Sequence, residues 1–256
     1  FPSATLGTLA ILFTFLMVYE LFKKKNIALT AAFFLAISPW HLQFSRVAFE
    51  TNSAIFWSVL GTWAFLRGVQ NKEKKFMLWM SLSAIAFGAN LFMYHNARVF
   101  IPLYSLLLIF LYKEVLFKNI KFLILPALIA LVYIAALLPI VFSISGQLRY
   151  KGTTIFGDVG PQQKAADQIA LDSENGQGIV GKLIHNRRVA YVPIIIDNYL
   201  SNFRPNYLFF HADMDRHHAP EIGLLYLWDL FFILAGMYFL ISKNYSGKSK
   251  IIIFWW

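Results

Sequence analysis

Long apolar runs separated by short polar turns constrain this chain more than any other feature of its sequence. A helix needs about 20 mostly apolar residues to cross the roughly 30 Å hydrocarbon core of a bilayer. Runs near this length occupy residues 4–22, 27–44, 53–69, 76–94, 99–112, 122–144 and 223–241, and the last residues, IIIFWW, begin another. The fifth run is short for a span. The pattern predicts an all-α membrane protein, a polytopic transmembrane helix bundle of about seven spans plus a truncated eighth.

The composition agrees with a membrane protein and excludes a soluble domain. Hydrophobic residues make up 58% of the chain and charged residues 14%, whereas a soluble domain has about 25% charged residues. The net charge of +10 could indicate a nucleic-acid partner, but the basic residues lie in short clusters between apolar runs, which is typical of membrane topology. We therefore expect membrane lipid and no nucleic acid as partners. The chain has no cysteine, so disulfides and thiolate metal sites are excluded.

Lysines mark every second turn between the apolar runs. They are Lys23, Lys24 and Lys25, then Lys72, Lys74 and Lys75, then Lys113, Lys118 and Lys121, and finally Lys243, Lys248 and Lys250. The short turns that alternate with these lysine turns carry only two basic residues, Arg46 and Arg98. Lysine and arginine gather in cytoplasmic loops. The lysine turns are therefore predicted to be cytoplasmic, and residue 1, the turns at 45–52 and 95–98, and the stretch 145–221 to lie outside.

These boundaries divide the chain into three parts. Residues 1–144 are expected to form a transmembrane bundle of about six spans, residues 145–221 one large extracytoplasmic loop domain, and residues 222–256 a further span with the start of the next. The first half of the loop domain is polar and rich in glycine, which favours exposed loop with one short helix. Apolar residues then recur at near-helical spacing over 179–203, which predicts an interfacial helix interrupted near Pro193. Asp229 falls inside the seventh run, so we expect it to face the bundle or a wet cavity.

The first outer turn, SPWHLQFSRVAFETN, holds Arg46 and Glu50. The two residues are four apart and can share one face of a helix. They are candidates for a substrate cavity at the mouth of the bundle, and the alternative is an ion pair at a helix end.

The second outer turn, MYHNARVFIP, concentrates four polar side chains between two spans: Tyr94, His95, Asn96 and Arg98. Such a cluster can hold a phosphate, because arginine presents a planar fork of donors and the other three side chains add more. The alternative is that these residues anchor the helix ends in the headgroup region.

The third polar cluster precedes the seventh run. It contains Arg204, His211, Asp213, Asp215, Arg216, His217 and His218. Histidine and carboxylate at this density could bind a divalent cation, with His211, Asp213 and Asp215 as weak candidates. The spacing matches no zinc pattern such as HExxH, and a solvated polar loop is the alternative. No cofactor is certain, and a divalent cation is the one candidate.

Three segments together resemble the polytopic C-type glycosyltransferases of the dolichyl-phosphate-mannose protein mannosyltransferase and aminoarabinose transferase group. The opening FPSATLGTLAILFTFLMVYELF resembles the second span of that group, and SPWHLQFSRVAFETN resembles its next outer turn. The third and most specific segment, NYLSNFRPNYLFF followed by RHHAPEIGLLYLWDLFFILAG, resembles the end of its large outer loop. The resemblance implies transfer of a sugar from a polyprenyl-phosphate carrier to an acceptor on the extracytoplasmic face of the cell membrane.

The resemblance also implies roles for the polar outer turns. The catalytic acid of the group lies in the first outer loop, which would precede Phe1, so we expect a fragment that lacks the general base and is inactive alone. Cations would stabilise the lipid-phosphate leaving group, with Arg98, Arg204 and Arg216 as candidates and His217 beside them. Arg46 and Glu50 would shape the cavity from the opposite side.

A transporter or flippase of lipid-linked saccharides is the competing interpretation. It would also carry lysine turns and many aromatic residues, but it predicts paired repeats and broken helices, and no second half of the chain resembles the first. A third class, a non-catalytic membrane scaffold, would not need convergent polar outer turns. The acceptor, the donor sugar and the length of the carrier leave no trace in the sequence.

Overall fold

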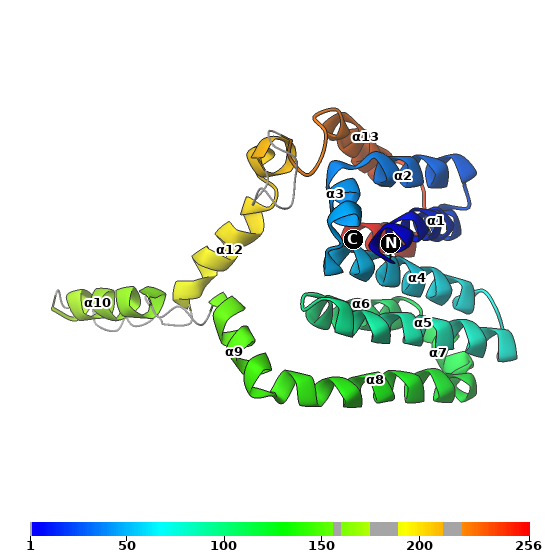
Figure 1. Ribbon diagram of the computed structural model, residues 1–256, viewed down its shortest axis with the longest axis horizontal. Coiled ribbons are helices and arrows are strands. Elements are labelled where there is room, and N and C mark those ends of the chain that lie inside the picture. The colour runs from blue at the N-terminus through cyan, green and yellow to red at the C-terminus, as the bar shows by residue number, and fades with distance from the viewer. Residues whose placement is uncertain (1, 156–159, 175–188, 212–221) are drawn as a thin grey trace. The chain divides into compact units, whose positions relative to one another are not determined.

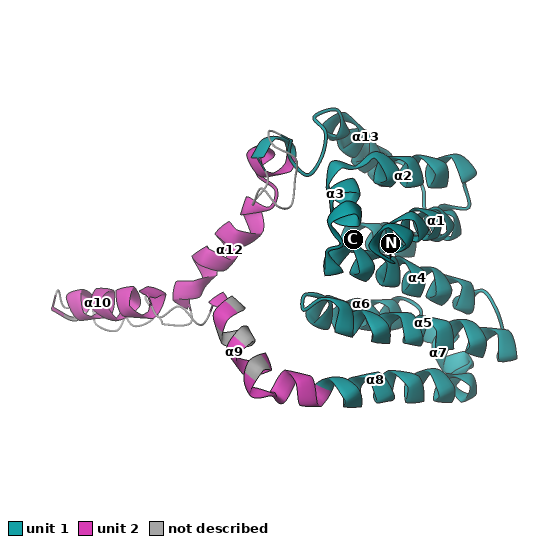
Figure 2. Cartoon of the chain, in the orientation of Figure 1, with its two compact units in different colours: residues 1–137, 209–256 teal, residues 138–208 magenta. Residues whose placement is uncertain are grey.

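A computed structural model describes residues 2–155, 160–174, 189–211 and 222–256 (Figure 1). Every regular element in these ranges is a helix, which confirms the predicted all-α class. By chain contacts the protein divides into two compact units, residues 1–137 with 209–256 and residues 138–208, which we call units 1 and 2 (Figure 2). The predicted division at 144 and 221 stays a prediction.

Unit 1 contains most of the apolar helices. They are α1 (Pro2–Phe22), α2 (Lys25–Ile37), α3 (Pro39–Val47), α4 (Glu50–Val69), α5 (Glu73–Met93), α6 (Ala97–Leu111), α7 (Lys113–Lys118), the 3₁₀ turn η1 (Ile120–Leu123), most of α8 (Ile124–Phe142), α13 (Asp229–Ser242) and α14 (Gly247–Trp255). α1 packs against both α2 and α4, and α4 packs against α5 (Figure 1). The helices that form from the first apolar runs therefore pack against one another in unit 1.

Three helical segments are long and apolar enough to cross a membrane: Pro2–Phe22, Glu73–Met93 and Ile120–Phe142. A fourth is added if α2 and α3, which meet at an angle of 56°, form one bent span. α6 and α13 are apolar but shorter, with 15 and 14 residues. The protein is thus a membrane protein, and the count of about seven spans stays a prediction.

Small residues let the helices of unit 1 approach closely. A β-carbon on Gly61 of α4 would lie 2.5 Å from the ring of Phe87 on α5. A β-carbon on Gly88 of α5 would overlap the ring of Tyr133 on α8. Since lipid tails are as apolar as leucine, helices in a membrane associate through such close packing and through interhelical hydrogen bonds. Both kinds of contact join α4 to α5, because Ser83 donates a hydrogen bond of 2.9 Å to the carbonyl oxygen of Gly61.

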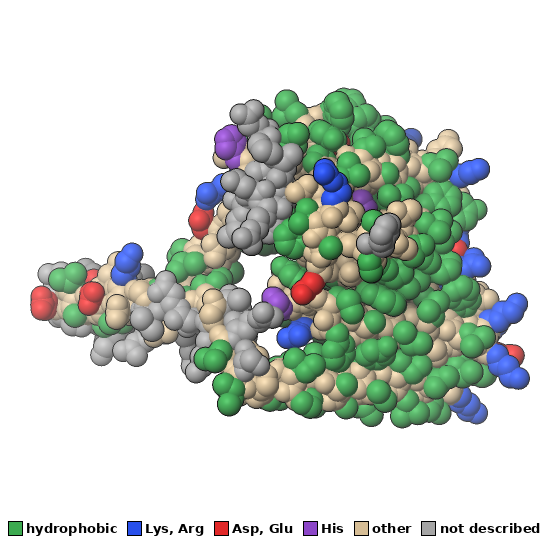
Figure 3. Space-filling model, viewed as in Figure 1, with side chains coloured by type: hydrophobic (Ala, Val, Ile, Leu, Met, Phe, Trp, Pro, Cys, Tyr) green, Lys and Arg blue, Asp and Glu red, His purple; other side chains and the backbone are tan. Residues whose placement is uncertain are grey.

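One end of unit 1 is rich in lysine, and we call it the lysine end. α1 and α4 finish there and α5 begins there, and basic side chains gather on it (Figure 3). Glu20 is buried at this end and accepts hydrogen bonds from Arg67 at 2.9 Å and from Gln70 at 2.8 Å. It also pairs with Lys23 of the first lysine turn. Glu20 therefore joins the ends of α1 and α4.

Unit 2 is helical in its described ranges. It contains α9 (Ile144–Thr153), α10 (Gly160–Glu174), the 3₁₀ turn η3 (Val189–Tyr191) and α12 (Val192–Ser201). The buried side chain of Tyr191 receives a hydrogen bond of 2.9 Å from Gln162 of α10. α10 forms in the polar, glycine-rich part of the loop domain where one short helix was expected, and it is 15 residues long.

The structure places the ends of two helices differently from the expectation. Pro193 does not interrupt a helix but lies in the first turn of α12, where its missing N–H group costs no hydrogen bond. The preceding residues 179–188 lie outside the described residues. Asp229 begins α13 rather than lying inside it, but its side chain is buried, which agrees with the expectation that it faces the bundle. Its Oδ2 accepts a hydrogen bond of 2.9 Å from the Tyr226 amide. A carboxylate is favourable there because of the positive end of the helix dipole.

Candidate functional site

The second polar turn lies at the end of unit 1 opposite the lysine end. α4 and α5 run antiparallel, and Asn90 of α5 donates a hydrogen bond of 3.0 Å to the carbonyl oxygen of Ala54 on α4. Four residues beyond this contact on each helix, at about 1.5 Å per residue, lie Glu50 and Tyr94. The helix register therefore places Glu50 at the level of the turn that holds Tyr94, His95, Asn96 and Arg98. We call these five residues the arginine rim.

Arg98 is held in place by the end of the neighbouring helix. It lies in the first turn of α6, is half-buried, and its Nε donates a hydrogen bond of 3.2 Å to the carbonyl oxygen of Leu91 in the last turn of α5. That contact occupies one of the five N–H donors of the guanidinium group. The four remaining donors form the planar fork that fits two phosphate oxygens.

Tyr94 and His95 stack on each other beside Arg98. Their rings are 5.1 Å apart with an angle of 22° between the planes, and both residues are half-buried. Tyr94 has an extended backbone, with φ of −146° and ψ of 145°, which ends α5 and starts the turn. Asn96 is exposed and precedes the first residue of α6. The turn thus presents hydroxyl, imidazole and amide groups next to a fixed guanidinium group.

The shared helical face expected for Arg46 and Glu50 was wrong. Arg46 lies in the last turn of α3 and Glu50 begins α4. Between them Ala48 adopts a left-handed conformation, with φ of 60° and ψ of 38°, which ends α3. Both side chains are exposed, and among the described ion pairs none joins them.

Two buried asparagines join neighbouring helices close to the arginine rim. Asn52 of α4 is fully buried and donates a hydrogen bond of 2.8 Å to the carbonyl oxygen of Ser3 on α1. Asn90 is also fully buried, and besides Ala54 its amide contacts Ser58 at 2.7 Å. We did not single out either asparagine from the sequence. The signal was an amide inside an apolar run, where lipid exposure is costly and a partner on another helix is expected.

The structure describes only part of the third cluster. Arg204 is exposed and forms an ion pair of 2.5 Å with Asp197 of α12. His211 is the exposed last residue of the π-helical turn η4 (Asn206–His211). Asp213, Asp215, Arg216 and His217 lie outside the described residues. Within the described ranges, no three histidine or carboxylate side chains lie together as a metal ion would need.

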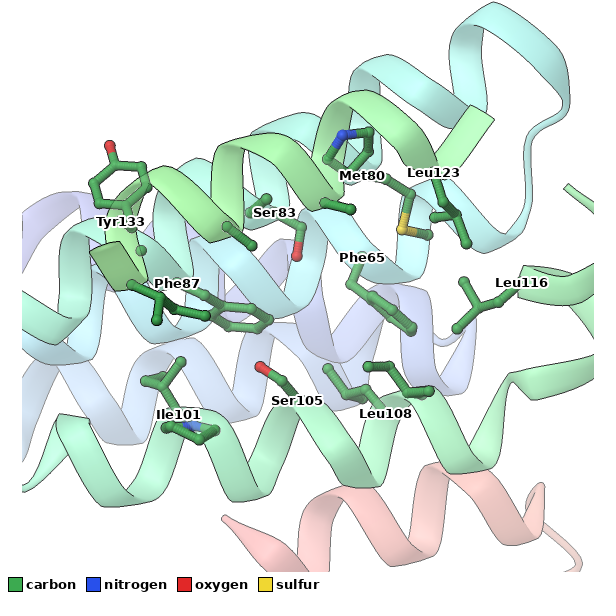
Figure 4. A pocket seen from close by; sticks show the side chains of 18 of the residues that line it. Phe65, Met80, Ser83, Phe87, Ile101, Ser105, Leu108, Leu116, Leu123 and Tyr133 are labelled. Carbon is green, nitrogen blue, oxygen red and sulfur yellow. The ribbon is translucent and has the colours of Figure 1, made fainter. Parts of the chain in front are cut away.

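An apolar pocket of about 450 Å³ lies among α4, α5, α6, α7, η1 and α8. Phe65, Phe87, Leu108 and Leu123 line it from four of these elements (Figure 4). Leu91, whose carbonyl oxygen holds Arg98, also lines the pocket. Its volume lies within the range of about 300–1,000 Å³ that is typical of small-molecule sites.

Comparison with known proteins identifies the family. A family model described as dolichyl-phosphate-mannose-protein mannosyltransferase matches residues 1–140, a range that includes the whole arginine rim. No curated protein and no solved structure matches the chain significantly. The matched range covers more than half of the 256 residues, and it includes helices that are long and apolar enough to cross a membrane. The chain therefore belongs to the dolichyl-phosphate-mannose-protein mannosyltransferase family of membrane glycosyltransferases, which use lipid-linked sugar donors.

Proposed function

We propose that this protein transfers a sugar from a polyprenyl-phosphate carrier to an acceptor on the extracytoplasmic face of the cell membrane. The observation that supports this most is Arg98, a half-buried guanidinium group fixed by the Leu91 carbonyl at the end of unit 1 opposite the lysines. Phosphate is the leaving group when the anomeric carbon of such a donor is attacked. A fixed cation beside that phosphate stabilises the charge that develops in the transition state.

The proposed roles of the other residues follow from their places. The paired rings of Tyr94 and His95 offer donors to the phosphate or the sugar, and Asn96 adds an amide. Glu50 lies at the same level on α4 and would bound the proposed donor site. A carboxylate must deprotonate the acceptor hydroxyl. Arg46, Arg204, Arg216 and His217 remain candidates for the donor site, and His211, Asp213 and Asp215 for a divalent cation.

A turnover assay tests this function. The full-length protein, purified in detergent, is incubated with polyprenyl-phosphate sugars and acceptors, and released polyprenyl phosphate is measured. We expect release that depends on both protein and acceptor. Saccharide lipid that crosses a liposome bilayer without release would identify the protein as a transporter of lipid-linked saccharides and contradict the proposed reaction.

The proposed face can be tested with single cysteines, because residues 1–256 contain none. Asn96→Cys, at the arginine rim, is expected to react with a membrane-impermeant maleimide on intact cells. Lys74→Cys, exposed in the first turn of α5 at the lysine end, is expected to react only after permeabilisation. The reverse pattern would place the arginine rim in the cytoplasm and contradict the assignment from the positive-inside rule.

A further inference from the structure

The apolar pocket of unit 1 has a different polarity at its two ends. Toward the arginine rim, Tyr133 of α8 packs over Gly88 and lies 6.2 Å from the ring of Phe92, so α5 and α8 are in contact there. Toward the lysine end, Lys113 enters the lining beside Leu116 and Ile120. Figure 4 shows the same order, with Tyr133 at one end of the pocket and Leu116 and Leu123 at the other. Among the described residues that line the pocket, Lys113 alone is charged.

Several residues that line the pocket are also exposed on the outer surface of the bundle. Ile109 of α6 is 49% exposed, Phe117 of α7 70% and Ile120 of η1 56%, although all three line the pocket. In the segment formed by η1 and α8, only 6% of the residues in the most apolar stretch are buried. Large apolar side chains exposed beside such helices are in contact with lipid chains in a bilayer. An occupant can therefore enter the pocket from the membrane.

The charged residues around Lys113 indicate which charge the occupant carries at this end. Lys118 and Lys121 follow it in the connection between α6 and α8, and the ammonium group of Lys248 on α14 lies 4.6 Å from the ring of Tyr112. Glu114 is exposed next to Lys113, and it is the one acidic residue of that connection. Four lysines against one glutamate favour an anionic group at this end of the pocket.

We propose that the pocket binds an anionic phospholipid from the leaflet at the lysine end, with one acyl chain among α5, α6 and α8 and the phosphate at Lys113. An acyl chain fits the apolar lining, and a lysine near a membrane surface attracts anionic lipid by about 1 kcal/mol, or fivefold in affinity. The site is distinct from the proposed sugar-donor site, whose phosphate would lie at Arg98. It does not depend on the proposed reaction.

Native mass spectrometry of the delipidated full-length protein tests the headgroup. Phosphatidylglycerol and phosphatidylcholine with identical acyl chains are added back and the retained adducts are compared. We expect about fivefold stronger retention of phosphatidylglycerol. Lys113→Gln should remove this preference, whereas Lys74→Gln, a control at the same end but outside the pocket, should keep it. Equal retention of the two lipids, or equal effects of the two substitutions, would overturn the proposal.

A second pair of variants tests the pocket itself. Ala84 lines the pocket on α5, whereas the next residue, Ile85, is 39% exposed and does not. Ala84→Phe should fill the pocket and reduce phosphatidylglycerol retention at least fivefold, while Ile85→Phe should leave it unchanged. Retention by a folded Ala84→Phe variant that equals that of the natural protein would contradict the proposal.

The unmodified protein provides a test that needs no variant to fold. A phosphatidylglycerol with a photoactivatable group on its acyl chain should crosslink to Ala127 and Ala130, the pocket face of α8. Leu128 and Leu131, which are 54% and 59% exposed on the same helix and outside the lining, serve as the matched control. Crosslinks spread evenly over both faces of α8 would show bulk lipid contact only and overturn the proposal.

Discussion

Replacement of Arg98 by alanine is expected to lower sugar transfer by about 100-fold or more, the size seen when one fixed donor to a developing oxyanion is removed. The guanidinium group is oriented by the Leu91 carbonyl before any substrate binds, so it needs no reorganisation in the transition state. kcat should therefore fall more than KM changes. Release of polyprenyl phosphate by the full-length protein measures both.

Two comparisons separate a role in catalysis from a role in folding. Arg98→Lys keeps the charge but loses the planar fork, so we expect activity between those of the natural protein and Arg98→Ala. Lys74→Ala removes a cation of the lysine end and should retain full activity. If Arg98→Ala lowers the unfolding temperature in proportion to its activity, or raises KM alone, then Arg98 does not act on the transition state.

The repeating features of the sequence predicted the helices well. Apolar runs set α1, α4 and α5 to within a few residues, because each run needs a helix to satisfy its backbone hydrogen bonds in lipid. The alternating lysine turns likewise predicted which helix ends lie together, and Lys and Arg gather at one end of unit 1 (Figure 3). Both patterns reflect which parts of the chain contact lipid and which contact water, so they can be recognised from the sequence alone.

Local backbone geometry was harder to predict. The spacing of Arg46 and Glu50 suits a helix, yet the left-handed Ala48 separates α3 from α4. The apolar run at 223–241 suggested a span that contains Asp229, yet α13 begins at that aspartate. In both cases a helix end, which depends on one residue and its hydrogen bonds, overrides the average character of the run.

Contacts between distant helices could not be predicted from a single sequence. Arg98 was a candidate from its residue type, but its bond to Leu91 depends on how α5 and α6 meet. Arg204 was a candidate for the same reason, and the structure instead pairs it with Asp197. Glu20 pairs with Lys23, three positions along the chain, but its contact with Arg67 joins residues 47 positions apart. A residue type thus indicates what a side chain can do, and packing decides which partner it meets.

Glu20→Ala is expected to lower the free energy of unfolding by about 3 kcal/mol, toward the lower end of the loss measured when one partner of a buried ion pair is removed. The Glu20 side chain is 4% exposed, and its removal would leave Arg67, which is 43% exposed, without its carboxylate. Solvent access to Arg67 limits the loss. Thermal unfolding of the full-length protein in detergent measures it, with Glu114→Ala, an exposed carboxylate of the same end, as the control that should change stability by less than about 0.5 kcal/mol.

A double-mutant cycle assigns the Glu20 effect to its contact with α4. If the carboxylate stabilises the bundle by joining α1 to α4, then Glu20→Ala and Arg67→Ala together should cost less than the sum of the two, with a coupling energy of about 1 kcal/mol or more. Gln70 also donates to Glu20 at 2.8 Å, so some coupling to α4 persists when Arg67 is removed. Additive losses would mean that each residue acts independently and that the ion pair does not hold the two helix ends together. Coupling would instead show that a buried carboxylate among basic side chains fixes the register of α1 against α4 at the lysine end.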